Sequence, residues 1–158
     1  MFKYTLVPKE FFSEGYAAGF LASVTSLEEG SSVKNKELPA YKAVLVYTGE
    51  DSRALEIERI VDALSRIDKY NKVVVNIGGG VVDIALAEGR KLLLVNTFPA
   101  ADDVTAQYFI FAALRQFQIN PEVTTVYLYG ESSDSIKEDL FRYFYSVESL
   151  PVSGPFAV

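Results

Sequence analysis

The sequence predicts an α/β protein whose mixed sheet is flanked by helices. Three β-prone apolar runs follow one another between residues 73 and 98, separated by a triple glycine and by a Glu-Gly pair. This pattern is typical of three consecutive antiparallel strands. Segments with helical periodicity stand before and after this block. The order therefore departs from the regular strand–helix alternation of a parallel sheet.

The composition fits one ordinary domain or two small lobes that share a core. Of the 158 residues 49% are hydrophobic, and the formal net charge is −6. An acidic surface repels phosphates, so we expect no nucleic-acid partner. No apolar run reaches the roughly eighteen residues of a membrane span, and no basic and then apolar leader opens the chain. We therefore expect a soluble, cytoplasmic protein.

Two missing residue types restrict the chemistry. The chain contains no cysteine, which excludes disulfides and thiol nucleophiles and fits a cytoplasmic protein. It also contains no histidine, which excludes a Ser-His-Asp triad, imidazole metal ligands and the usual general base of neutral pH. Any catalysis would depend on carboxylates, lysine, tyrosine, hydroxyl groups or a metal held by carboxylates.

A first strand–helix unit is predicted at the start of the chain. A β-prone run over residues 2–7 precedes a helix over about residues 9–23. Gly15 and Gly19 are expected to let this helix pack closely on a sheet. A polar loop over residues 25–36 follows. The buried stripe of the helix is expected to contain Phe12, Tyr16 and Phe20.

A second unit combines a buried strand with the most regular helical pattern of the chain. The strand is the continuous apolar run over residues 43–47. The stretch from Gly49 to Ser52 ends it and supplies caps for the helix. The outward face of the helix, with Asp62 and Arg66, is expected to be solvated. Its buried face is expected to contain Ile57, Ile60, Val61, Leu64 and Ile67.

The second half continues with a helix, a strand and a helix. Asp102, followed by Asp103, is expected to cap a helix that runs to about residue 118. A strand over residues 124–129, a last helix and a short strand from Ser146 follow. The buried stripe of the last helix is expected to contain Ile136, Leu140, Phe141 and Phe144.

The helix over residues 104–118 is the candidate protein interface. It has apolar residues on every side, which predicts burial on two sides, between its own sheet and another layer or subunit. Core packing and a partner interface are the two interpretations of its aromatic residues. The candidate interface residues are Tyr108, Phe109 and Phe111.

The triple glycine is the candidate ligand site. Glycines permit positive φ and let backbone N–H groups converge on an anion. The pattern is not a Walker loop, because no Lys-Ser or Lys-Thr follows, and it lacks the Rossmann spacing. Asn76 before the turn is placed to orient a water or a metal hydrate, and Asp83 lies beyond it. The alternative is that the glycines only shape a tight hairpin.

The stretch Asn76-Ile77-Gly78-Gly79-Gly80-Val81-Val82-Asp83 resembles the second phosphate loop of the actin-like ATPase superfamily, which includes actin, sugar kinases and heat-shock chaperones. Residues 72–150 resemble the second lobe of that superfamily, which has a ribonuclease H-like fold. Residues 1–71 resemble a partial first lobe, and residues 151–158 form a tail. The segment Leu128-Tyr129-Gly130-Glu131-Ser132-Ser133 falls where the adenosine loop would be.

More closely, the whole chain resembles an uncharacterised bacterial family of actin-like fold and unassigned activity. Compared with that family, the chain is expected to lack the opening strands of the first lobe, including the first phosphate hairpin. The resemblance rests on Tyr4-Thr5-Leu6-Val7-Pro8-Lys9-Glu10-Phe11-Phe12, on Leu94-Val95-Asn96-Thr97-Phe98, on Asp102-Asp103 through Tyr108-Phe109, and on Leu128-Tyr129-Gly130.

Departures from the superfamily pattern imply that ATPase activity is lost. Asn76 stands where active members have the Asp that holds the metal hydrate, and Val81 and Val82 replace hydroxyl residues. Residues 98–101 replace a Gly-Gly pair, and Glu131 adds negative charge near a nucleotide. Losing one such electrostatic group typically costs about 10²–10³ in rate.

We therefore expect a non-catalytic domain, without catalytic or metal-binding residues or a cofactor, that acts through a protein partner or as a homo-oligomer such as a dimer. The alternative is a weak ATP-binding or phosphate-binding domain, with Mg²⁺ and residual phosphotransfer. Its nucleotide-binding residues would be Asn76, Gly78, Gly79, Gly80, Asp83 and Gly130.

Overall fold

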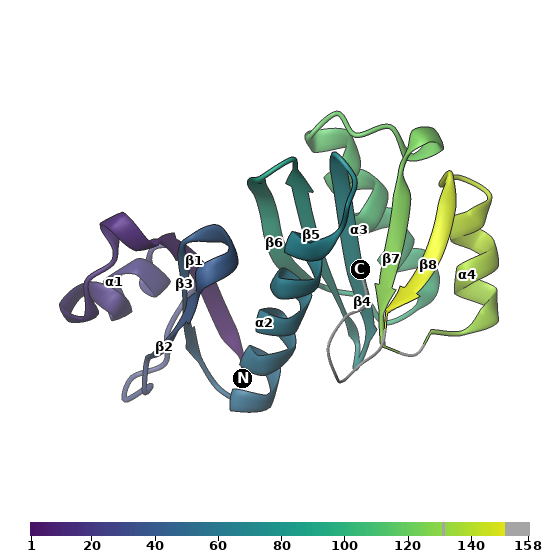
Figure 1. Ribbon diagram of the computed structural model, residues 1–158. Coiled ribbons are helices and arrows are strands. Elements are labelled where there is room, and N and C mark those ends of the chain that lie inside the picture. The colour runs from purple at the N-terminus through teal and green to yellow at the C-terminus, as the bar shows by residue number, and fades with distance from the viewer. Residues whose placement is uncertain (131, 151–158) are drawn as a thin grey trace. The chain divides into compact units, whose positions relative to one another are not determined.

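The computed structural model describes residues 1–130 and 132–150, so the predicted tail and Glu131 lie outside the described residues. The chain divides into two compact units, Met1–Asp62 and Ala63–Val158, with the boundary inside one helix. No helix among the described residues is long and apolar enough to cross a membrane. The elements, labelled in Figure 1, are β1 (Lys3–Pro8), α1 (Ala17–Ala22), β2 (Lys34–Leu38), β3 (Ala43–Thr48), α2 (Asp51–Arg66), β4 (Asn71–Gly78), β5 (Val81–Glu88), β6 (Lys91–Pro99), α3 (Asp103–Gln116), β7 (Thr125–Tyr129), α4 (Asp134–Phe141) and β8 (Ser146–Leu150).

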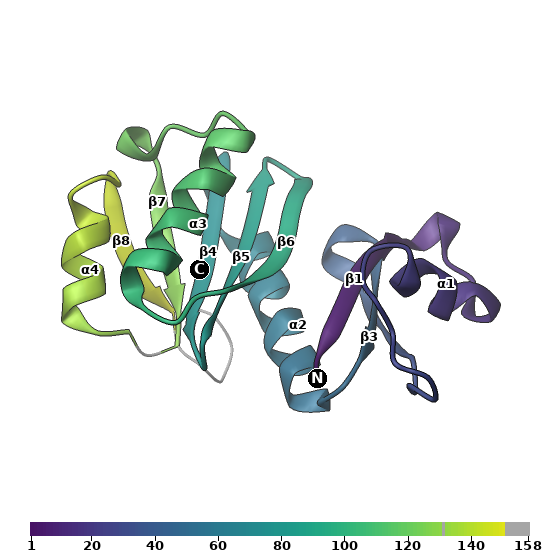
Figure 2. The same cartoon turned by 180° about the vertical axis from the view of Figure 1, so that it is seen from behind.

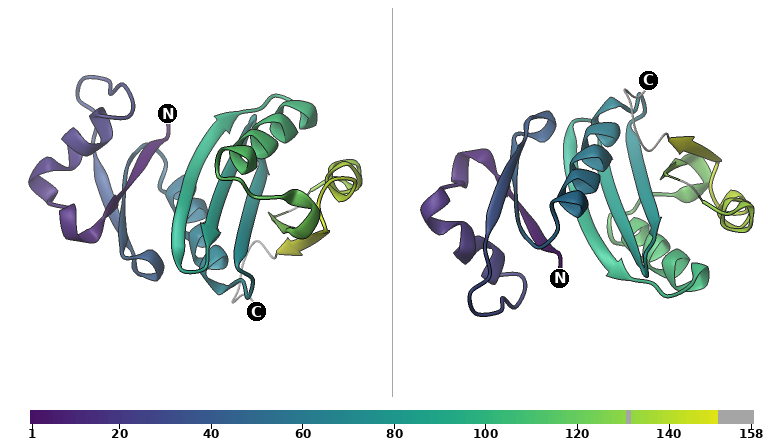
Figure 3. Two further views of the ribbon diagram at one scale, coloured as in Figure 1. Left: turned by 90° about the horizontal axis from the view of Figure 1, so that it is seen from above. Right: turned by 90° about the horizontal axis from the view of Figure 1, so that it is seen from below.

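The first unit is built on a three-stranded antiparallel sheet in the order β1-β3-β2. The central strand β3 is buried from Ala43 to Tyr47, which confirms the prediction of a buried strand. Helix α1 lies against one face of this sheet (Figure 3). The buried cluster on that face consists of Val7, Ala17, Leu21, Val44 and Val46.

The helix predicted over residues 9–23 is wrong in its extent. The chain instead forms two 3₁₀ turns, Lys9–Phe11 and Glu14–Tyr16, before the six-residue helix α1. The break has a backbone cause, because Phe12 and Ser13 both adopt extended conformations, with ψ values of 136° and 132°. Extended residues cannot continue the helical ladder of hydrogen bonds, so two separate turns result.

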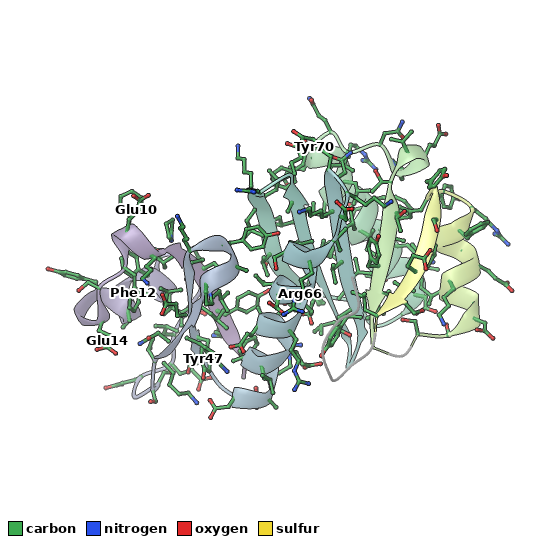
Figure 4. The ribbon with its side chains drawn as sticks, viewed as in Figure 1. Glu10, Phe12, Glu14, Tyr47, Arg66 and Tyr70 are labelled. Atoms are coloured by element: carbon green, nitrogen blue, oxygen red, sulfur yellow. The ribbon has the colours of Figure 1, made fainter. Side chains whose placement is uncertain are left out.

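The side chains of this segment also differ from the prediction. Phe12, labelled in Figure 4, stacks on Phe20 with ring centroids 6.3 Å apart, and both rings pack against the core of the first unit. Tyr16 is 71% exposed rather than part of a buried stripe. Gly15 and Gly19 are exposed, and a Cβ atom on Gly19 would meet no atom within 4 Å. The predicted close packing at the two glycines is therefore wrong.

Strand β2 begins inside the segment predicted to be a polar loop, residues 25–36, and extends two residues beyond it. Its sequence Lys-Asn-Lys-Glu-Leu carries almost no hydrophobic signal, yet it pairs with β3 from Lys34↔Tyr47 to Leu38↔Ala43. Charged residues are common on edge strands because they discourage pairing with other chains. An edge strand of this kind is invisible to hydrophobic periodicity.

The helix predicted after the buried strand over residues 43–47 is confirmed, and it is α2. Its predicted buried face is buried throughout, with no more than 6% of any of these side chains exposed. At its start, Asp51 accepts hydrogen bonds from Lys34 Nζ at 2.6 Å and from the Tyr47 hydroxyl at 2.9 Å. Tyr47 is labelled in Figure 4. These contacts join β2, β3 and the first turn of α2.

The second unit contains a five-stranded mixed sheet in the order β6-β5-β4-β7-β8. Strands β4, β5 and β6 are antiparallel, as predicted, whereas β7 runs parallel to β4 and β8 parallel to β7. Helices α3 and α4 contribute to one buried cluster on the same face of the sheet (Figure 2). This arrangement confirms the mixed α/β sheet flanked by helices.

The core of this unit can be compared with two burial predictions. Helix α3 buries only one stripe, which includes Ile110 and Leu114, while Val104 and Tyr108 are 76% and 66% exposed. Among the described residues of this unit α3 is buried on one side, and burial of its other side against another subunit stays a prediction. In the last helix Phe141 is 62% exposed, because it lies beyond the buried stripe. The buried residues of that stripe are Ile136, Leu140 and Phe144.

Candidate functional site

The triple glycine forms the tight turn between β4 and β5. Strand β4 ends at Gly78, and the turn residues Gly79 and Gly80 have φ values of 63° and 79°. A Cβ atom on any of the three would meet nothing within 4 Å. Two of these glycines are therefore favoured by their left-handed backbone and not by lack of space. The carbonyl of Gly80 accepts the N–H of Ala100 at 2.9 Å, which holds the turn against the end of β6.

A cleft of about 350 Å³ opens beside this turn. The beginnings of α3 and α4 form its other walls, so backbone N–H groups and two helix dipoles lie near one space. Such an arrangement is favourable for an anion. The cleft is lined by Ile77, Gly78, Gly79, Gly80, Ala100, Ala101, Asp102, Asp103, Ser132, Ser133 and Ile136.

Both helices at the cleft begin with a side-chain cap. Asp102 Oδ1 accepts the N–H of Thr105 at 2.8 Å, which confirms its predicted role as the cap of α3. The N–H of Thr105, and secondly its hydroxyl, hold the pKa of Asp102 below its usual range. Ser133 Oγ accepts the N–H of Ile136 at 3.2 Å and caps α4. The charges of Asp102 and Asp103 oppose the attraction of the cleft for an anion.

A polar group made by three neighbouring strands lies behind the turn. In the strand register, Asp83 of β5 stands opposite Asn76 of β4 and Thr97 of β6. Asn76 Nδ2 donates to Asp83 Oδ2 at 3.1 Å, and the Thr97 hydroxyl donates to Asp83 Oδ1 at 2.6 Å. Asp83 is only 1% exposed. Both of its oxygens therefore accept a hydrogen bond from an adjacent strand.

The polar group and the cleft belong to different faces of the sheet. Val82 and Ile84 point into the core that α3 covers, and side chains alternate along a strand, so Asp83 points to the opposite face. Asp83 and Asn76 accordingly do not line the cleft. The structure brings the three glycines together with the two helix starts, and it places the predicted polar residues elsewhere.

Gly130 directly follows strand β7 and has a φ of 78°. Its N–H donates to the carbonyl of Leu150 at 3.3 Å, and it does not line the cleft. Ser132 and Ser133 from the same loop do line it. The predicted loop over residues 128–133 therefore reaches the cleft through its two serines and not through its glycine.

Thr97 is the residue that reading the sequence missed. Its role depends on which residue of β6 stands opposite Asp83, and this register follows from a bulge on β6 between Leu92 and Leu94. The signal available in the sequence is that Asn96 and Thr97 interrupt an otherwise apolar strand. A polar pair in such a strand indicates a buried hydrogen-bonding partner.

The three candidate interface residues have different environments. Tyr108 is exposed, whereas Phe109 stacks on Phe98 of β6 with centroids 4.7 Å apart. Phe111 lies on the other side of α3, edge-on to Tyr143 at 5.2 Å and stacked on a buried ring of the α4 region. The aromatic side chains of α3 therefore extend from β6 across the helix to α4.

Among residues 1–130 and 132–150, no three or more Asp and Glu side chains gather in a way that would hold a metal ion. The described polar clusters include the hydrogen-bonded group at Asp83, helix caps and surface ion pairs. One example is the ion pair between Lys36 and Glu58, whose atoms lie 3.1 Å apart.

The fold and the glycine turn define the class of protein. The structure is similar to the crystal structure of a protein from Bacteroides thetaiotaomicron VPI-5482, described as having an actin-like ATPase fold and unknown function. The TM-score is 0.77 at 20% sequence identity, and the match covers 94% of this chain and 65% of that one. The chain thus spans somewhat less than two thirds of that protein, and it has an actin-like ATPase fold.

The family follows from the sequence match. Residues 56–147 match the model of a family described as protein of unknown function (DUF3822). This match includes more than half of the chain, so the chain belongs to that family. Proteins of curated function gave no significant match. The predicted resemblance to an uncharacterised family of actin-like fold is confirmed.

Proposed function

We propose that this chain is a non-catalytic actin-like domain that acts through protein contacts and not through ATP turnover. The observation that carries the proposal is the environment of Asp83. By the resemblance to active members of the superfamily, Asp83 and Asn76 stand at positions of the phosphate loop. Here Asn76 is an amide that donates to Asp83, so the two side chains satisfy each other.

This pairing argues against a metal-dependent reaction at the loop. Mg²⁺ prefers carboxylate and water oxygens at about 2.0–2.1 Å and keeps several of its waters. To bind it, Asp83 would have to give up the hydrogen bond from Asn76 or the one from Thr97, within a buried site. Leaving a buried polar group without its partner costs about 1–3 kcal/mol. A metal hydrate is therefore disfavoured at this position.

Steady-state phosphate release from Mg-ATP tests the proposal. We expect the chain to release phosphate no faster than its Asp83→Asn variant, which keeps the size of the side chain and removes the carboxylate. The overturning result is turnover by the unmodified chain that falls at least about 10²-fold in the variant, as expected when an electrostatic group of a working site is lost. Circular dichroism of both proteins checks that the variant is folded.

Protein contact is supported by the aromatic side chains of α3. Tyr108 presents two thirds of its surface to solvent at the centre of a helix that has no charged residue between Asp103 and Arg115. Aromatic residues are enriched in interface centres, whereas charged residues are depleted there. The net charge of −6 and the lack of cysteine favour a cytoplasmic setting and a partner other than nucleic acid.

A second candidate function is anion binding in the cleft beside the glycine turn. The observation that favours it is the convergence of the turn with the starts of α3 and α4. In this function the cleft would hold a phosphate group of a nucleotide or another phosphate ester, while Asp83 remains paired with Asn76. Binding without turnover is compatible with the first proposal.

Thermal unfolding with millimolar phosphate or Mg-ADP tests this second function, because a ligand of the native state raises the unfolding temperature. Ala101 is exposed and lines the cleft, so Ala101→Glu places a negative charge there. Ala22→Glu, at an exposed position of the first unit, is the matched control. We expect stabilisation of the unmodified chain and of the control but not of Ala101→Glu. No stabilisation of the unmodified chain would exclude the function.

A further inference from the structure

We infer that the edge strand β6 and the adjoining side of α3 form a surface that binds a second copy of this chain, with the two β6 strands antiparallel across a two-fold axis. The inference rests on the proposed protein-contact function and names the partner. Among the described residues, β6 pairs with β5 on one side only and ends the sheet. A long apolar edge strand is a template for another strand.

The composition of β6 suits such pairing. It has nine residues, and Leu92 to Val95 form a continuous apolar run that is only half-buried. After this run, the backbone N–H of Thr97 already has an acceptor, because it donates to Asn96 Oδ1 at 2.8 Å. The bulge leaves Leu93 without a partner residue in β5. Pairing is therefore centred on residues 92–95.

The side of α3 next to β6 is neutral and continues this surface. Phe109 faces β6, since it stacks on Phe98, whereas Gln107 faces α4 through its hydrogen bond of 3.2 Å to Asp139. Within α3, the residues at helical spacing from Phe109 that are at least partly exposed carry no charge. They are Thr105, Ala112 and Gln116.

The distribution of charge selects the antiparallel arrangement and a second copy. Arg90 precedes β6 and Lys91 begins it, while Asp102 and Asp103 follow it, so its two ends have opposite charges. Antiparallel copies place the basic end of each strand near the acidic end of the other, whereas parallel copies would place like charges together. The two α3 helices begin with acids and end with Arg115. In the antiparallel arrangement the acidic start of each helix lies toward the basic end of the other, which is also favourable.

The size of the surface is adequate for a specific dimer. Nine strand residues extend about 30 Å, and the sheet and helix layers together are roughly 20 Å deep. Each copy would bury about 600 Å², so the total of about 1,200 Å² falls at the lower limit of specific interfaces. Two-fold symmetry also closes the assembly, because both exposed β6 edges are used.

Cysteine cross-linking tests the arrangement, because the chain has no cysteine of its own. Leu93→Cys, Leu94→Cys and Val95→Cys place a thiol near the two-fold axis, where a disulfide requires Cα atoms about 4.4–6.8 Å apart. Ser149→Cys, exposed on the opposite edge strand β8, is the control. After oxidation we expect at least one of the three variants to form at least five times more covalent dimer than the control. If none exceeds the control, the arrangement is wrong.

Light scattering of the unmodified chain gives an independent measurement. We expect a species of twice the 17.5 kDa chain mass, and at least a tenfold weaker dimer for Ala112→Glu but not for the matched Ala22→Glu. A monomer at every concentration, or equal weakening by both variants, would overturn the inference. These outcomes differ from failure of the proposed function, which would appear as ATP turnover that depends on Asp83.

Discussion

Asp83 is the residue on which the interpretation of this protein depends. It is buried and accepts a hydrogen bond from each adjacent strand. The first donor, Asn76, stands out as unusual when the sequence is compared with active members of the superfamily that it resembles. The second, Thr97, becomes visible once the strands are in register. The buried group therefore joins three adjacent strands through side-chain hydrogen bonds.

The contribution of Thr97 can be measured directly. Thr97→Val removes the hydroxyl donor and leaves one Asp83 oxygen without it, so we expect a loss of about 1–3 kcal/mol in the free energy of unfolding. Thr97→Ser keeps the hydroxyl and is expected to retain most of that stability. Urea unfolding of the two variants and the unmodified chain provides the comparison. Equal stability of the two variants would show that the hydroxyl contributes nothing.

A second polar group predicts a dependence on pH. The hydrogen bond from Lys34 and then that from Tyr47 lower the pKa of Asp51, and the bond to Asp51 raises the pKa of Lys34. Because the pKa of Asp51 is lower in the folded state, its ionised carboxylate adds to the free energy of unfolding at pH values above its unfolded pKa of about 3.9. This contribution to stability is lost as the pH falls through the folded pKa. The Lys34 contribution is lost only at high pH, as pH rises through its raised folded pKa.

The stability difference between the unmodified chain and Asp51→Asn should therefore be constant between about pH 5 and 9 and shrink in acid. Urea midpoints at neutral pH and near pH 2 measure it. A difference that stays the same in acid would show that the ionised carboxylate is not the source.

At the scale of elements, the sequence predicts best where hydrophobic periodicity is strong. Apolar spacing indicates which faces of an element are buried. It therefore predicted helix α2 and the three strands β4, β5 and β6. Strand β2 was not predictable, because it is a charged edge strand whose place depends on pairing with β3. The prediction of one helix over residues 9–23 was wrong, because the backbone at Phe12 and Ser13 is extended although the aromatic residues have helical spacing.

The junction between β3 and α2 gives a test at this scale. Gly49 has a φ of 103°, and a Cβ atom there would lie 2.7 Å from Phe2 Cα. Gly49→Ala combines this steric conflict with an unfavourable backbone conformation, and we expect it to cost at least about 1–3 kcal/mol of stability. The matched Gly19→Ala, in a helix and with free space around it, is expected to stabilise by about 0.5–1 kcal/mol. Thermal unfolding that ranks the two variants in reverse would contradict the structure.

At the scale of the whole molecule, the class of fold was predictable and the geometry of the site was predictable only in part. The glycine turn between two strands indicated an actin-like phosphate loop, and the structural comparison confirms that fold. The cleft, however, is completed by the starts of α3 and α4, more than twenty residues away along the chain. Which side chains reach it depends on the sheet order and on where each helix begins, and neither is a local property of the sequence.

The most direct test of the central claim is a crystal structure of the chain soaked with Mg-ADP, examined at Asp83 and at the glycine turn. We predict that Asp83 keeps its hydrogen bonds to Asn76 and Thr97, and that no metal ion or metal-bound water contacts its oxygens, whether or not phosphate density lies in the cleft. A magnesium ion held by Asp83, directly at about 2.0–2.1 Å or through an ordered water, with Asn76 turned away, would contradict the account.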